Sequence, residues 1–142
     1  MGDAQILESV VRELLQLYDI AAPPIPIERM LQHPLDDMWD DIDMNFVTST
    51  FMKISTPFSP RMSLARFLAR HIAKSPWGEK RGLDGLDDDQ SIHQFARVIV
   101  MPADLVLELS AASQTPQIIS LHFEVPEEDA ELRLQELAGY VN

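Results

Sequence analysis

The sequence predicts a small, mostly helical α+β domain. In four stretches of the 142-residue chain, apolar residues recur at the spacing of an amphipathic helix. One segment, Asn45 to Ser55, instead interleaves Phe, Val, Met and Ile with Thr and Ser, which is typical of one or two short strands. The composition, 46% hydrophobic and 24% charged, is that of a folded chain. We therefore expect a single domain over residues 1–142.

The N-terminal half has helices separated by prolines. Residues 4–18 carry two apolar rows at helical spacing, and the prolines of 21–24 end that helix. Pro26 fits the first turn of a short helix, Ile27 to Gln32. The next helix is expected at about Ser63 to Lys74 and ends at Ser75-Pro76.

The C-terminal half is predicted to be helical throughout. Three aspartates at 87–89 favour a helix that starts there and runs from Asp89 to Val100, since acidic charge stabilises a helix N-terminus. A further helix is expected at 103–112. Thr115-Pro116 is a cap and first-turn pair for the next, and Pro126 opens the last helix.

Charge and composition exclude several classes of function. The chain has 11 Lys and Arg against 23 Asp and Glu, a net charge of −12, which opposes direct binding to nucleic acid. It has no cysteine, so disulfides and thiolate chemistry are excluded. No apolar run approaches the roughly 18 residues of a membrane span, and the N-terminus lacks the basic region of a secretory signal. We expect a cytoplasmic protein that does not bind membranes.

Four motifs in order along the chain resemble one family. They are Pro-Pro-Ile-Pro-Ile-Glu at 23–28, Ser-Leu-Ala-Arg-Phe-Leu-Ala-Arg-His-Ile at 63–72, Ser-Ile-His-Gln-Phe-Ala-Arg-Val-Ile-Val-Met-Pro at 91–102, and the segment 119–137. The chain is similar in these motifs to the bacterial ImmA/IrrE zinc metallopeptidases. The resemblance implies a zincin-like fold with a small sheet. It also implies three parts: an N-terminal helix with short strands (1–60), degenerate active-site helices (61–102) and C-terminal helices (103–142).

The catalytic residues of that family are replaced in this sequence. A zincin helix carries two histidines at i and i+4, which bind zinc, with a glutamate after the first as general base. Arg66 and Arg70 occupy the histidine positions, Phe67 that of the base, and Ser91 that of the third ligand on the next helix. Guanidinium groups cannot bind zinc, because they stay protonated and have no acceptor. We therefore expect no zinc and no peptidase activity.

The resemblance implies a pseudo-peptidase with a regulatory role. Active members of the family cut repressor-type transcription regulators. A degenerate relative is expected to bind such a protein partner in the former active-site cleft without cutting it.

The substituted helix is also unusually cationic. Residues 61–81 hold six of the 11 cations and a single acid, Glu79. Arg66, Arg70 and Lys74 follow each other at i, i+4 and i+8, so they lie along one helix face. One hypothesis is a cleft that binds a carboxylate or phosphate of a partner or small ligand. The alternative is internal neutralisation by the following acids, Asp84, Asp87, Asp88 and Asp89.

In a third alternative, the protein is still an enzyme, with an altered metal site. A metal site could have moved to His71, His93 and an aspartate of 87–89, although none of the four histidines forms an i, i+4 pair with another.

Overall fold

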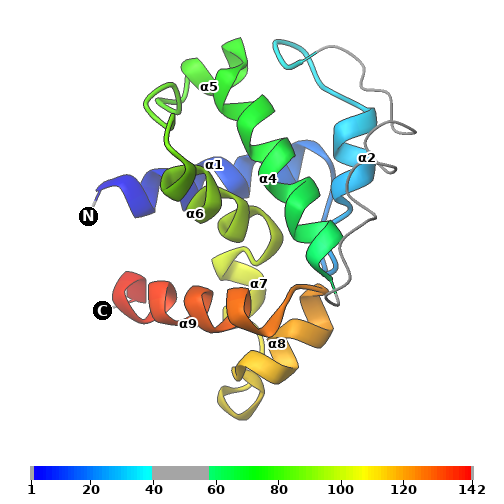
Figure 1. Ribbon diagram of the computed structural model, residues 1–142, viewed down its shortest axis with the longest axis vertical. Helices are drawn as coiled ribbons and strands as arrows, with labels where there is room; N and C mark the ends of the chain where they lie inside the picture. Colours follow the sequence, from blue (N-terminus) through cyan, green and yellow to red (C-terminus); the bar gives the residue numbers. More distant parts are fainter. Residues whose placement is uncertain (1, 40–57, 142) are drawn as a thin grey trace. The chain divides into compact units, whose positions relative to one another are not determined.

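Every element of the described chain is a helix (Figure 1). The computed structural model describes residues 2–39 and 58–141. The elements are α1 (Gly2–Leu17), α2 (Ile27–Gln32), α4 (Ser59–Lys74), α5 (Pro76–Glu79), α6 (Asp89–Val100), α7 (Ala103–Leu107), the 3-10 turn η1 (Ala111–Ser113), α8 (Pro116–Phe123) and α9 (Glu127–Val141). None of these helices is both long and apolar enough to cross a membrane.

The predicted α+β class with a small sheet is wrong for the described chain. No residue of 2–39 or 58–141 lies in a strand. The central helix was expected to cross this sheet, but within the described chain α4 packs against the helices α2 and α5. The strands expected within 45–55 lie outside the described residues.

Most predicted helices are confirmed, with shifted ends. The helices α2 and α6 have the predicted bounds. Helix α4 begins four residues before Ser63, because Pro60 fits within its first turn instead of preceding the helix. Helix α7 stops at Leu107, so the helix expected at 103–112 is shorter than predicted, and η1 follows at Ala111–Ser113.

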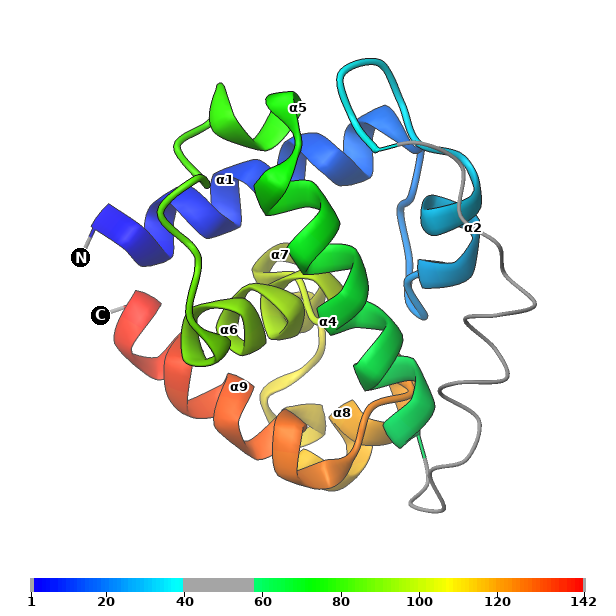
Figure 2. The same ribbon diagram turned by 45° about the horizontal axis from the view of Figure 1, so that its top comes forward.

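The chain divides into two compact units, residues 1–25 with 97–142, and residues 26–96. The single domain over 1–142 stays a prediction. In the first unit, α8 packs against α9 (Figure 1). The turn between these two helices is closed by Ser120, whose hydroxyl donates to the Val125 carbonyl at 2.6 Å. In the second unit, α2 and α5 both pack against α4 (Figure 2).

A buried ion pair joins three segments of the first unit. Arg133 on α9 donates from Nη2 to Glu8 on α1 at 2.6 Å, and both side chains are at most 5% exposed. The Nε of Arg133 donates to the Met101 carbonyl at 2.8 Å, and the other Glu8 oxygen accepts from the Ala103 N–H at 3.3 Å. The two charged side chains therefore pair with each other. They also provide hydrogen-bond partners for two backbone groups at the junction between α6 and α7.

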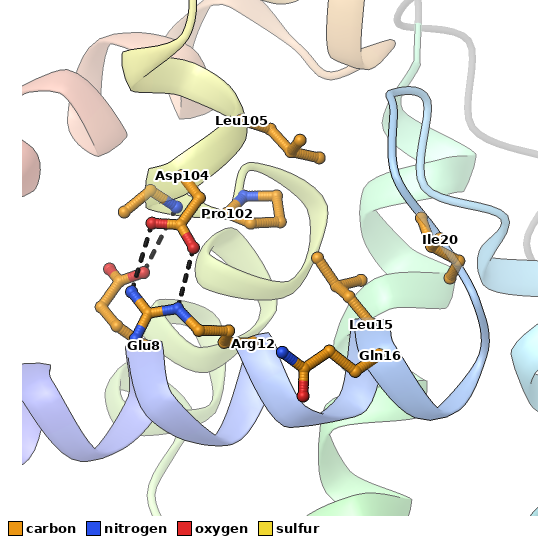
Figure 3. A pocket seen from close by; sticks show the side chains of 9 residues that line it. Glu8, Arg12, Leu15, Gln16, Ile20, Pro102, Asp104 and Leu105 are labelled. Carbon is orange, nitrogen blue, oxygen red and sulfur yellow. Dashed lines mark hydrogen bonds and ion pairs between the residues drawn. The ribbon is translucent and has the colours of Figure 1, made fainter.

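A second ion pair of this unit lies at the surface. On α1, Arg12 donates from Nε and Nη2 to the two carboxylate oxygens of Asp104, at 2.8 and 3.2 Å (Figure 3). Both side chains are about half exposed. The hydrogen bond from Arg12 holds the pKa of Asp104 below its ordinary value of 3.8.

Loss of the buried cation should destabilise the protein far more than loss of the exposed one. We expect Arg133→Met to lower the free energy of unfolding by about 3–5 kcal/mol, because Glu8 is left charged and buried. Arg12→Met, the matched control, should cost about 0–1 kcal/mol. Urea unfolding of the two variants measures both values, and equal losses would contradict the role given to Arg133.

Asp104 should stabilise the fold only when it is ionised. Its pKa is lower in the folded state, so its contribution is present above the ordinary value and is lost as the pH falls through the folded-state pKa. Asp104→Asn should therefore cost at most about 1 kcal/mol at about pH 7, and the cost should shrink as the pH falls below the ordinary pKa of 3.8. Urea unfolding over a series of pH values tests this, and a cost that stays constant or grows in acid would contradict it.

Candidate functional site

One pocket of the second unit contains most of the residues singled out on the substituted helix. It has a volume of about 450 Å³ and is named here the α4 pocket. Its lining comes from α4 and from the segments on either side, and consists of Met38, Trp39, Phe67, Arg70, His71, Lys74, Ser75 and Pro76. No acidic side chain is among these residues.

The helical period explains which α4 residues reach this pocket. Successive residues turn by about 100°, so positions 67, 70, 71 and 74 fall within an arc of about 100°. The opposite side of α4 is buried and carries Leu64, Ala65, Leu68, Ala69 and Ile72. Arg66 lies about 40° beyond Arg70, toward the buried side. It is half-buried, with its Nε enclosed, and it does not line the α4 pocket.

Three ring side chains form the apolar wall. The centroid of His71 lies 4.3 Å from that of Phe67 and 6.0 Å from that of Trp39, with the Trp39 pair nearly perpendicular. His71 Nδ1 bonds to the Phe67 carbonyl at 2.9 Å. Because a carbonyl only accepts, Nδ1 carries the proton. The indole Nε1 of Trp39 donates to the Leu31 carbonyl at 3.1 Å. Both polar rings are therefore fixed by hydrogen bonds to backbone.

The junction between α4 and α5 closes one end of the pocket. Ser75 caps α5: its hydroxyl accepts from the Gly78 N–H at 3.1 Å and donates to the Ile72 carbonyl at 2.7 Å. Gly78 allows this close approach, since a Cβ there would lie 2.1 Å from the Ile72 carbonyl oxygen. Trp77, which follows Pro76, is buried, with Arg81 stacked 3.8 Å from its ring centroid.

The expected internal neutralisation accounts for part of the positive charge. Arg70 Nη2 donates to Asp89 at the start of α6, at 2.9 Å, and the side chains are 40% and 85% exposed. A second hollow of about 280 Å³ shares Arg70 and Lys74 with the α4 pocket, but its lining includes Glu79, Asp84 and Asp87. The two cations therefore lie between a hollow lined by acids and a pocket whose described lining residues include none.

Ser91 has a structural role at the start of α6. Its backbone N–H donates to the Asp88 carboxylate at 2.8 Å. Hydrogen bonds from the Ser91 hydroxyl and then from its backbone N–H hold the pKa of Asp88 below its ordinary value. This is the geometry of an N-cap, in which the Asp88 carboxylate accepts from the third residue of the helix. Of the four substituted positions, the α4 pocket brings together Phe67 and Arg70, and leaves out Arg66 and Ser91.

Within residues 2–39 and 58–141, no three histidine or acidic side chains gather closely enough to hold a metal ion. The relocated site suggested for His71, His93 and an aspartate of 87–89 therefore gains no support from the described chain. The expectation that no zinc is bound stays a prediction.

The first unit has a pocket of its own, of about 210 Å³, between α1 and α7 (Figure 3). Its charged lining residues, Glu8, Arg12 and Asp104, are already paired within the protein. Sequence reasoning missed this pocket, and it also missed Met38 and Trp39 as part of the α4 pocket.

A methyl group at Gly78 should displace α5 from α4. We expect Gly78→Ala to lower the free energy of unfolding by about 1–3 kcal/mol, because the new Cβ overlaps a backbone oxygen. At Gly85 a Cβ meets nothing within 4 Å, so Gly85→Ala is the control and should change stability by less than about 0.5 kcal/mol. Thermal or urea unfolding measures both, and a Gly78 variant as stable as the control would contradict the packing described.

Comparison with known proteins gives no relative. No family model matches the chain, no curated protein matches it, and no solved structure matches it. The resemblance to the ImmA/IrrE peptidases therefore rests on the sequence motifs alone, and a function has to be argued from the α4 pocket.

Proposed function

We propose that this protein is a non-catalytic binding module that holds a protein partner in the α4 pocket. One observation carries the proposal: two cations, Arg70 and Lys74, line the same hollow as the rings of Trp39, Phe67 and His71, and none of its described lining residues is acidic. Such a combination suits a partner surface that presents both negative charge and apolar side chains.

The hydrogen bonds of Ser75 and His71 favour a binding function of the pocket over a catalytic one. The one hydroxyl among the lining residues belongs to Ser75, and it serves as a helix cap. His71 has its Nδ1 bonded to a backbone carbonyl and shares no hydrogen bond with Ser75 in the described chain. A serine nucleophile needs an adjacent base, so this pair lacks the arrangement for acyl transfer. Arg70 and Phe67 supply neither a zinc ligand nor a general base.

A protein is favoured over a bare anion as the occupant. Arg70 is partly neutralised by Asp89, which weakens its attraction for a lone phosphate or carboxylate. The ring side chains of the pocket add contact area that only a ligand with apolar groups would use. The net charge of −12 disfavours nucleic acid. The motif resemblance suggests a transcription regulator as the partner and the cytoplasm as the location, and both belong to this proposal.

A partner encoded beside this gene should depend on the pocket for binding. We expect Lys74→Glu to weaken binding of such a protein at least about tenfold, since the change reverses a charge at the rim of the pocket. Lys74 is exposed, so the fold should be unaffected. Phe67→Ala should weaken binding through the apolar wall. Calorimetry with purified products of the flanking genes measures the affinities, and circular dichroism checks folding.

The matched control is Arg29→Glu on α2, which makes the same change in net charge at an exposed position outside the pocket. It should bind like the wild type. Equal losses in the two charge variants would indicate a general electrostatic effect. That result, cleavage of the partner, or no binding by any flanking product would contradict the proposal.

A further inference from the structure

We infer that the α4 pocket recognises a short acidic-aromatic segment of a protein, in which a glutamate or aspartate stands next to an aromatic residue. The inference rests on the proposed function and deepens it, because it names the chemistry of the partner segment. The carboxylate would bind at Arg70 and Lys74, and the aromatic ring would pack against Trp39, Phe67 and His71.

The spacing of groups on α4 matches two adjacent residues of a peptide. Positions 70 and 74 are one turn apart, as are positions 67 and 71, and the two pairs occupy neighbouring parts of one helix face. Side chains one turn apart have Cβ atoms about 5–6 Å apart. A carboxylate and a ring on adjacent residues of a ligand can therefore reach the cations and the rings together.

The apolar wall is formed before any ligand arrives. Hydrogen bonds to backbone carbonyls fix Trp39 and His71, and Phe67 contacts the His71 ring at a centroid distance of 4.3 Å. A preformed wall reduces the conformational entropy that binding would otherwise cost. Aromatic rings pack edge to face as well as stacked, so a pocket of this volume with three rings favours an aromatic guest.

The charges of the described residues favour a carboxylate that enters from the side of the α4 pocket. Glu79, Asp84 and Asp87 line the neighbouring hollow, where they would repel an anion. Among the described residues, no acid lines the α4 pocket beside Lys74 and Arg70. Asp89 competes for Arg70, but its side chain is 85% exposed, so the pair is weakly held and a second carboxylate can share the guanidinium.

The direct test uses fluorescently labelled, terminally capped five-residue peptides and measures polarisation on the full chain. The parent peptide has glutamate and phenylalanine in adjacent central positions between serines. In one variant glutamine replaces glutamate, and in another alanine replaces phenylalanine. We expect each variant to bind at least about tenfold more weakly than the parent, the size of one lost charged hydrogen bond or one lost ring contact.

A matched pair of protein variants tests the competition at Arg70. Asp89→Asn removes the internal partner and should tighten binding of the glutamate peptide about threefold, while binding of the glutamine peptide stays unchanged. Asp87→Asn also removes one negative charge, from the neighbouring hollow, but it leaves the Arg70–Asp89 pair intact. Its effect on binding of the glutamate peptide should therefore be smaller than that of Asp89→Asn. Equal tightening by both variants would overturn the assignment of the carboxylate to Arg70.

The outcomes separate this inference from the proposed function. If a flanking gene product binds in a manner that depends on Lys74, but the three peptides bind alike, the acidic-aromatic segment is wrong and the binding function stands. If sodium phenylacetate binds as tightly as the parent peptide, the pocket is a site for small aromatic acids, and the peptide assignment is overturned.

Discussion

The period of helix α4 is the constraint on which the second unit depends. One side of this helix must bury Leu68, Ala69 and Ile72 against its neighbours, which fixes the direction of every other side chain. Phe67, Arg70, His71 and Lys74 lie on the opposite arc and line the pocket. The α4 pocket therefore follows from how the helix is packed. A charge on that arc can be changed without disturbing the buried side.

The same geometry explains why two arginines at i and i+4 have different surroundings. Arg70 lies within the arc of the pocket and meets Asp89. Arg66 lies about 40° closer to the buried side, so its Nε is enclosed. The hypothesis from the sequence placed Arg66, Arg70 and Lys74 together on one helix face. In the structure, Arg70 and Lys74 line the α4 pocket and Arg66 does not.

The helices could be predicted because their signals are local in the sequence. Contacts between residues far apart in the sequence could not be predicted in this way. Side-chain caps fix the starts of α6 and α8, and Pro116 lies in the first turn of α8; such signals act within a few residues. The sheet was inferred from one segment and from the family motifs, and no described residue supports it.

Trp39 reaches the α4 pocket from a loop 28 positions before Phe67, which no local pattern encodes. The pair of Glu8 and Arg133 had a signal that could have been read: each lies within an apolar row of its helix, with opposite charge.

The chain has two tryptophans, and this offers the most direct test of the central claim that the α4 pocket is the binding site. Trp39 lines the pocket, whereas Trp77 is buried and stacked with Arg81. Titration of the nitrogen-15-labelled protein with an acidic-aromatic peptide, followed by nuclear magnetic resonance, resolves the two indole N–H signals. We expect the Trp39 signal to shift in a saturable way while the Trp77 signal stays in place. A saturable shift of Trp77 alone, or no shift of either signal, would contradict the account.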